Sequence, residues 1–233
     1  MKIENLESLS EWYGNVELDF DRELIIYRHK AIKKYFKGSI CLEIAPAQGV
    51  MTKELVGNFE KVFAVDGSEN LLNQIPSYPN VFKYHSMIED FDIDIKFDTI
   101  IMDHVLEHIQ DTGKVLNKIK SLMHSNSNLI IGVPNALSFH RLLGVEMGEL
   151  KSPYELNSRD LELGHFRVFD LNSLVEEVKL AGYNVLSTDG VFLKFLSNSQ
   201  IQKSFNKAMK DGCFSLGDHF KENCAEIYVI CTL

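Results

Sequence analysis

Short apolar segments alternate with segments of helical periodicity along most of this chain, and this alternation restricts the fold more than any other feature. Near-continuous apolar strands that are separated by helices indicate a parallel sheet covered by helices on both faces. The segments predicted to be strands are 39–45, 61–66, 80–85, 97–103 and 127–134. Helices are predicted over 23–36, 68–75 and 111–123, and a further helix follows the turn after the first strand.

The C-terminal part has a different order of elements. Residues 170–183 have an amphipathic helical pattern, with Asp170 as a predicted N-cap and Gly182 near the C-terminal end. Two further strands, 184–196 and 225–233, are joined by a largely helical connection. A chain that ends on a strand in such a fold suggests an antiparallel pair at one edge of the sheet. We therefore expect an α/β, doubly wound fold, with a mostly parallel seven-stranded sheet and an antiparallel C-terminal strand.

Charge and hydropathy exclude several classes of protein. The formal net charge is −9, which disfavours a nucleic-acid partner because phosphate backbones attract basic surfaces. No apolar run approaches the roughly 20 residues that cross a bilayer, so no membrane partner is expected. The sequence MKIENLESLS lacks the features of a signal peptide, and the four cysteines show no C-x-x-C spacing. We expect a cytoplasmic protein with a single domain over residues 1–233, either a monomer or a homodimer.

The turn after the first predicted strand carries the first candidate binding residues. In open α/β sheets, ligands bind at the carboxyl ends of the strands. A pyrophosphate group would need G-x-G-x-x-G at this turn, but EIAPAQG contains only Gly49. Glu43 lies within the first strand, and Asp66 closes the second, where a carboxylate can accept both hydroxyls of a ribose.

In their order and spacing, EIAPAQG, VDGS and HVLEH resemble the motifs of class I S-adenosylmethionine-dependent methyltransferases. The first motif of that family runs acid-x-G-x-G-x-G, and its glycines let the backbone approach the methionine portion of the donor. Ala45 and Ala47 stand at the first two glycine positions here, and Gly49 stands at the third. The resemblance extends over residues 23–233 and is to small-molecule enzymes, similar to methyltransferases of surface-glycan or nucleotide-sugar pathways.

The resemblance implies an activity, a co-substrate and a set of donor-binding residues. The activity is methyl transfer from S-adenosylmethionine to a hydroxyl or amine of a small molecule, such as a sugar or a nucleotide-linked intermediate. Asp66 matches the ribose-binding acid, and HSMIED falls where the family flanks the adenine ring. The donor-binding residues implied in this way are Glu43, Ala45, Ala47, Gln48, Gly49, Asp66, Gly67, Ser68, Ser86, Met87, Ile88 and Asp103.

The sequence DHVLEHIQD places His104, Glu107 and His108 directly after a predicted strand. On a helical turn, positions i, i+3 and i+4 share one face, so these side chains could converge on one point. In one interpretation the glutamate and the second histidine cap and brace a helix. In another, a histidine is the general base that takes a proton from the acceptor, since its pKa lies near neutrality.

A third interpretation of this motif is a metal site. It follows from the resemblance, because some methyltransferases of this fold hold a divalent cation with E-x-x-E-H and a later histidine. His165 could be that later ligand, and imidazole and carboxylate ligands suit Zn²⁺, Fe²⁺ or Mn²⁺. No residue is assigned to a metal, and the catalytic candidates remain His104, His108 and His165.

Two segments are expected to close over the cavity. Residues 1–36 form a predicted N-terminal cap, in which Tyr13 and Arg28 could contact the methionine end of the donor or simply pack. Residues 144–169 form a predicted substrate lid, because a polar, irregular insertion of this length often covers a site. Side chains near the acceptor, if they are not simply solvated, would be His140, Tyr154, Arg159 and Asp160.

Two alternatives from other classes stay open at this point. A non-catalytic binding protein or partner subunit could keep the same fold, and the A-P-A-Q-G loop motivates this alternative. A nucleotide-dependent oxidoreductase could share the doubly wound sheet, but the missing glycines and the closing strand pair disfavour it.

Overall fold

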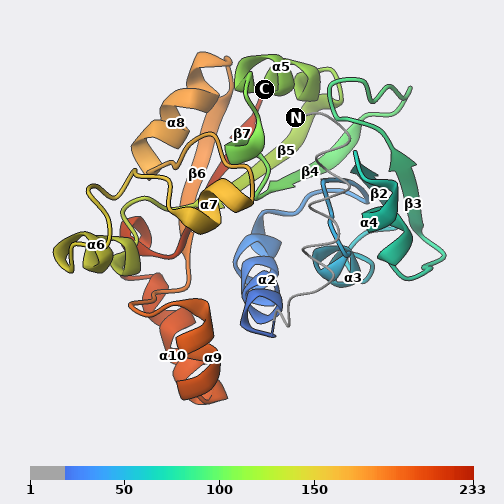
Figure 1. Cartoon of the computed structure of the whole chain (residues 1–233). Helices are drawn as coiled ribbons and strands as arrows, with labels where there is room; N and C mark the ends of the chain where they lie inside the picture. The colour runs from blue at the N-terminus through green and yellow to red at the C-terminus, as the bar shows by residue number, and fades with distance from the viewer. Residues whose placement is uncertain (1–18) are drawn as a thin grey trace.

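The computed structural model describes residues 19–233. They form one seven-stranded sheet with helices packed around it (Figure 1). The strands are β1 (Ile40–Ile44), β2 (Lys61–Asp66), β3 (Val81–His85), β4 (Phe97–Asp103), β5 (Met123–Pro134), β6 (Asn184–Val191) and β7 (Glu226–Thr232). The α-helices are α2 (Asp19–Ile32), α3 (Val50–Leu55), α4 (Glu69–Gln74), α5 (Thr112–Lys120), α6 (Phe139–Glu146), α7 (Ser158–Glu162), α8 (Leu171–Leu180), α9 (Asn198–Ser204) and α10 (Lys207–Gly217). Short 3₁₀ helices cover Lys33–Tyr35, Leu106–His108 and Lys221–Asn223.

The order of the strands is β3-β2-β1-β4-β5-β7-β6. Strands β1 to β5 pair in parallel, whereas β7 runs antiparallel to both β5 and β6. The predicted fold class is confirmed, including the reversed C-terminal strand. The chain order changes direction between β1 and β4, and in such sheets the crevice at the carboxyl ends of these strands receives the ligand.

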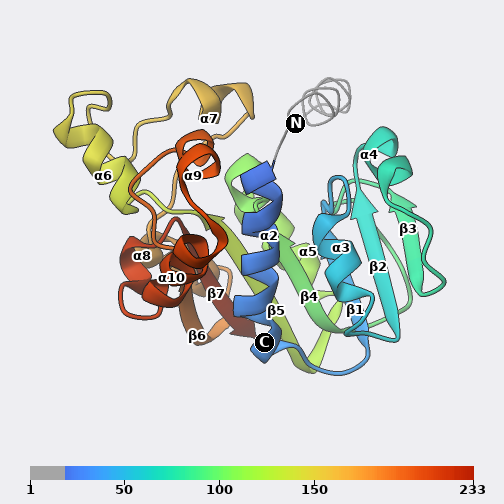
Figure 2. The same ribbon diagram turned by 90° about the horizontal axis from the view of Figure 1, so that it is seen from below.

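Helices cover both faces of the sheet, with α5 and α8 on one face and α2 and α3 on the other (Figure 2). Strand β4 shows why its sequence is apolar without interruption. Ile100 and Met102 pack in the core under α5 and α8, and Ile101 between them packs in the core under α2 and α3. Alternate side chains of a strand point to opposite faces, so a strand in a sheet that is covered on both faces needs apolar residues at successive positions.

Two predicted segments differ from the structure. The strand predicted over 184–196 ends at Val191, because Phe192 adopts a left-handed backbone with φ of 65° that turns the chain out of the sheet. The predicted lid over 144–169 is not irregular throughout. It contains α7, whose Asn157 and Asp160 form a reciprocal capping box.

No helix in the range 19–233 is both long and apolar enough to span a membrane. Tyr13, which was predicted as a candidate donor contact, lies outside the described residues.

Candidate active site

A cavity of about 800 Å³ opens at the carboxyl ends of β1, β2 and β4. All three candidate histidines line it, namely His104, His108 and His165. Ten of the twelve donor-binding candidates also line it, namely Glu43, Ala45, Ala47, Gln48, Asp66, Gly67, Ser86, Met87, Ile88 and Asp103. The other two, Gly49 and Ser68, are not part of its lining.

The turn between β1 and α3 keeps a glycine-like backbone although it contains alanines. Ala45 has φ of 53° and Ala47 has φ of 47°, in the left-handed region that favours glycine. Gly49, with φ of 76°, is required for packing, since an added Cβ would lie 2.9 Å from Ile75. The two missing glycines therefore leave the shape of the turn intact and add two methyl groups to the cavity wall.

Replacing either alanine of this turn by glycine is expected to change stability little. Glycine removes the strain of a left-handed backbone, which stabilises the variant by roughly 1–2 kcal/mol. Its greater freedom in the unfolded chain destabilises the variant by roughly 0.5–1 kcal/mol. We expect Ala45→Gly and Ala47→Gly to unfold in urea at the wild-type midpoint or above it. Ala64→Gly, in the buried interior of β2, is the matched control and should lower the midpoint. A fall as large as that of the control would contradict the strain that we assign to the turn.

Asp66 ends β2 with its carboxylate at the cavity, and only 6% of the residue is exposed. Its Oδ1 accepts a hydrogen bond from the Ser68 N–H at 2.8 Å. The Ser68 hydroxyl in turn accepts from the Leu71 N–H at 3.2 Å and so caps α4. Ser68 therefore shapes the turn that holds Asp66, which explains why it is absent from the lining.

Acidic groups gather where β1, β2 and β4 end. Burial raises the pKa of Glu43 to about 8, against a hydrogen bond from Thr52, and the nearby Asp103 and Asp66 raise it further. This cluster disfavours additional negative charge. It is suited to the part of a ligand that carries positive charge.

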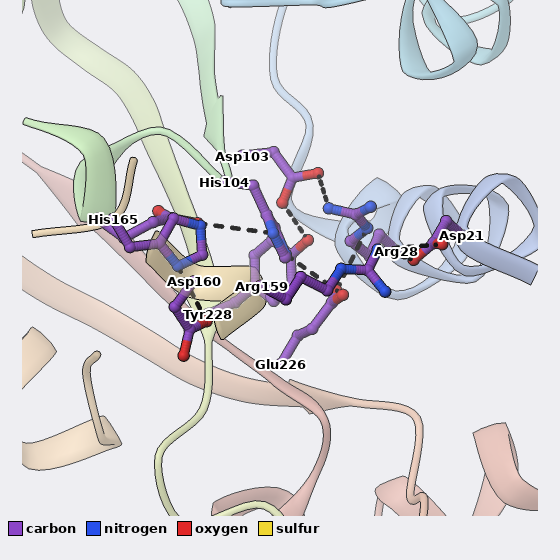
Figure 3. Close-up of polar contacts among 10 residues, drawn as sticks. Asp21, Arg28, Asp103, His104, Arg159, Asp160, His165, Glu226 and Tyr228 are labelled. Carbon is purple, nitrogen blue, oxygen red and sulfur yellow. Dashed lines mark hydrogen bonds and ion pairs between the residues drawn. The ribbon is translucent and has the colours of Figure 1, made fainter. Parts of the chain in front are cut away.

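A buried ion-pair network supports this end of the cavity (Figure 3). Arg28, from α2, lies with Nη1 2.9 Å from Oδ2 of Asp103 and with Nε 3.2 Å from Oε2 of Glu226. The Tyr228 hydroxyl donates to the other oxygen of Asp103. Glu226 and Tyr228 were not predicted from the sequence. A carboxylate at the start of the largely apolar strand β7 was the available signal for Glu226.

His104 belongs to this network. It has φ of 56°, and its ring lies between two buried carboxylates, with Nε2 3.2 Å from Glu226 and Nδ1 3.6 Å from Glu107. Burial lowers the pKa of His104, as does the charge of Arg28, but Glu226 and Asp103 outweigh both, so the pKa is raised. The two acids therefore stabilise the imidazolium form of His104 relative to a histidine in water.

His108 forms a second group with Glu107 and His165 on the other side of the H-x-x-E-H motif. The rings of His108 and His165 meet edge to face at 4.6 Å, and one ligand-type atom from each of the three residues lies within 4.8 Å of the others. Burial, and the charges of His165 and His104, lower the pKa of His108 to about 3. Glu107 thus lies beside both histidines of the motif, while His104 also faces Glu226 and His108 also packs against His165.

His165 is oriented by a carboxylate from the lid. Its Nδ1 lies 3.2 Å from Oδ1 of Asp160, and its side chain is 7% exposed. Burial raises the pKa of Asp160, but hydrogen bonds from His165, the Asn157 N–H and Arg141 lower it to about 2. Asp160 is therefore a carboxylate that can only accept, so Nδ1 of His165 must donate to it, and Nε2 is the ring nitrogen that this contact does not use.

The other residues predicted near the acceptor differ in their placement. Arg159 lines the cavity and pairs with Asp21 of α2 at 3.3 Å, and His140 also lines it. Tyr154 does not line the cavity, because its hydroxyl donates to Asp170 at 2.6 Å on the surface.

Comparisons with known proteins agree with this geometry. A family model described as a methyltransferase domain matches residues 18–188. A search of curated proteins found no match. A solved S-adenosylmethionine-dependent methyltransferase from Archaeoglobus fulgidus is similar, with 18% identity, a TM-score of 0.64, and coverage of 95% of this chain and all of that one.

Two further similar structures contain a bound ligand. A Burkholderia thailandensis 1,6-didemethyltoxoflavin N1-methyltransferase with its substrate and S-adenosylhomocysteine has 13% identity, a TM-score of 0.62, and coverage of 99% of this chain and 87% of that one. The N-methyltransferase NodS of Bradyrhizobium japonicum with S-adenosylhomocysteine has 12% identity, a TM-score of 0.62, and coverage of 98% of each chain. The family match covers well over half of the sequence, and the chain therefore belongs to the class I S-adenosylmethionine-dependent methyltransferases.

Proposed function

We propose that this methyltransferase modifies an oxygen or nitrogen atom of a small molecule and that His165 takes up the acceptor proton. The observation that carries the proposal is a single cavity lined by two kinds of residue. Donor-binding candidates from β1, β2 and β4 line it, and so does a histidine that a carboxylate orients, His165. The similar Burkholderia thailandensis enzyme, which has 1,6-didemethyltoxoflavin bound, supports a small-molecule acceptor here.

For the donor, we assign the ribose hydroxyls to Asp66 and the adenine ring to Ser86, Met87 and Ile88. The buried carboxylate at the end of β2 and the position of the other three residues in the same lining support this assignment. The turn of Ala45 and Ala47 would then face the methionine portion. The acidic groups near it suit the positive charge of the sulfonium and of the amino group.

The reaction is an in-line displacement. The acceptor atom forms a bond to the methyl carbon while the carbon–sulfur bond breaks, and sulfur leaves with the electron pair. Alignment of acceptor and donor supplies most of the catalysis. For a hydroxyl acceptor, Nε2 of His165 would take the proton, and Asp160 would stabilise the imidazolium that forms. A neutral amine needs positioning more than a base.

The other two histidines have different proposed roles. His104, whose imidazolium form is stabilised by nearby acids, holds Glu226 and Glu107 and thereby fixes the wall beside Asp103. His108 is favoured as the neutral ring, and it packs against His165. Both are therefore proposed to position the site rather than to take the acceptor proton.

A divalent cation is the second candidate for the group of Glu107, His108 and His165. These residues could hold one after small shifts, since their ligand-type atoms lie within 4.8 Å and neither carboxylate oxygen of Glu107 has a hydrogen bond within the described residues. A bound cation would polarise the acceptor oxygen. One contact favours the alternative without metal, because Oε1 of Glu107 already lies 3.6 Å from Nδ1 of His104.

A chelator distinguishes a metal site from a metal-free group of side chains. We expect dialysis against EDTA to leave both the melting temperature and the turnover of the wild-type protein unchanged. A fall in melting temperature with EDTA that Zn²⁺ or Mn²⁺ restores, and that is absent in Glu107→Gln, would assign the group to a metal instead.

Transfer itself is tested with donor that carries an isotopic label in its methyl group. The full chain is incubated with the donor and with chromatographic fractions of small metabolites, and labelled product and S-adenosylhomocysteine are quantified. Equal amounts of both products are expected from at least one fraction. Donor binding without labelled product from any fraction would instead favour the non-catalytic alternative.

Several sequence expectations stay predictions. These are the relation to surface-glycan or nucleotide-sugar pathways, the absence of a nucleic-acid partner, the cytoplasmic location, and the monomeric or dimeric state.

A further inference from the structure

The segment after β6 places a lysine, Lys194, in the lining of the cavity. Phe192, which is fully buried, turns the chain out of the sheet with φ of 65°. Its carbonyl accepts from the Ala225 N–H at 2.8 Å, and the next residue, Leu193, donates to the Cys213 carbonyl at 3.0 Å. The turn is thus fixed by the residue before β7 on one side and by α10 on the other, and Lys194 follows it in the cavity wall.

The ammonium group of Lys194 has little compensation for its charge. Within residues 19–233 its hydrogen bond is to a neutral group, Oδ1 of Asn198, at 2.6 Å, and no carboxylate forms an ion pair with it. Burial lowers the pKa of Lys194 to about 8, although Glu226 and Asp21 raise it. The group is therefore still mostly cationic at neutral pH, in a place where an unpaired charge is costly.

The acids near Lys194 are held by other partners. Glu226 lies against Arg28 and His104. Asp21 accepts from the Asn198 amide and pairs with Arg159. These contacts keep carboxylates away from Nζ and leave room for an anion of the ligand.

His140 adds a second polar group beside this lysine. It lines the same cavity, and its Nδ1 is buried without a hydrogen bond among the described residues. Burial lowers the pKa of His140 to about 2, and the charges of Lys194 and Arg141 contribute. A neutral imidazole can donate one hydrogen bond to an oxyanion without adding charge.

We propose that Lys194 and His140 form an anion subsite, and that the methyl acceptor carries a carboxylate or phosphate group that occupies it. An ammonium group binds such oxyanions through charge-assisted hydrogen bonds. The inference that the anion belongs to the acceptor rests on the proposed function, whereas the subsite itself rests on the geometry alone.

The first experiment measures melting temperature with inorganic phosphate and with acetate, each against sodium chloride at equal ionic strength. Each series is run with and without saturating S-adenosylhomocysteine. We expect at least one oxyanion to raise the wild-type melting temperature beyond the chloride value. Which of the two does so distinguishes a phosphate group from a carboxylate group. No shift with either probe would overturn the proposal.

Variants then locate the effect. Lys194→Met should weaken oxyanion binding by about 10- to 100-fold, the loss expected for one hydrogen bond to a charged group, while Lys194→Arg should retain most of it. Lys53→Met, on the exposed side of α3, is the matched control and should behave as wild type. Lys194→Gln replaces the Met variant if that protein does not fold. A Met or Gln variant that binds the oxyanion as tightly as wild type would overturn the proposal.

Oxyanion binding and S-adenosylhomocysteine binding are measured separately, so failure of the anion subsite can be distinguished from failure of the proposed function. A lysine-dependent oxyanion shift without any binding of S-adenosylhomocysteine would support the subsite and contradict the donor assignment. Once acceptors are identified, pairs that differ only in an anionic group extend the test. Lys194→Met should lower kcat/KM selectively for the anionic member, and an equal loss for both members would contradict acceptor recognition.

Discussion

The His165→Ala variant is expected to lose turnover by roughly 10²- to 10⁴-fold with a hydroxyl acceptor, since this is the usual contribution of a positioned general base. The reason is the contact of Asp160 with Nδ1 of a histidine that lines the cavity, which leaves Nε2 as the nitrogen that would take the acceptor proton. Affinity for the donor should remain near the wild-type value. The measurement is kcat from S-adenosylhomocysteine release, beside donor affinity by calorimetry.

Controls distinguish a base from a structural residue. His219→Ala, at an exposed position on the surface, should retain full turnover. Asp160→Asn keeps the size of the side chain but removes its charge, so it should lower kcat and shift the pH profile of the remaining activity. If His165→Ala retains full turnover with a hydroxyl acceptor, the catalytic assignment is wrong.

The Arg28→Met variant is expected to destabilise the protein by roughly 3–5 kcal/mol, because it leaves two carboxylates buried without their cation. Asp103 and Glu226 are both in contact with the guanidinium, and Arg28 itself is only 7% exposed. The free energy of unfolding in urea measures the effect. The cost should fall in the double variant Arg28→Met/Glu226→Gln, which removes one of the two uncompensated charges.

A neighbouring arginine provides the matched control for this prediction. Arg22 lies on the same helix and is exposed, so Arg22→Met should change stability by less than about 0.5 kcal/mol. Equal effects at positions 22 and 28 would show that the buried network does not stabilise the fold as we describe.

The fold was predictable because its strands are buried on both faces. An uninterrupted apolar run such as β4 has few alternatives once helical patterns flank it on both sides. The end of β6 was not predictable in the same way. Residues 192–196 continue the apolar pattern, and only tertiary contacts from Cys213 and Ala225 hold Phe192 in a left-handed turn.

The candidate site was predictable where one segment carries several of its residues. The donor candidates follow the ends of β1, β2 and β4, and the parallel topology brings these ends together. Partners that come from distant segments were not predictable. The contact between His104 and Glu226 joins two residues that are 122 positions apart in the chain.

Gly49 and Ser68 show a different limit. Both match motif positions, but the structure uses one for packing against Ile75 and the other to cap α4. A motif marks the residues that a loop needs in order to form as well as those that touch a ligand. Sequence position alone does not separate these two roles.

The central claim, that this cavity binds the methyl donor, is tested most directly by calorimetric titration of wild type and Asp66→Ala with S-adenosylmethionine. We predict one donor per chain for wild type. Asp66→Ala should bind roughly 10- to 100-fold more weakly, because it loses at least one hydrogen bond to a charged group. A wild-type protein that binds no donor, or an Asp66→Ala variant that binds it as tightly as wild type, would contradict the account.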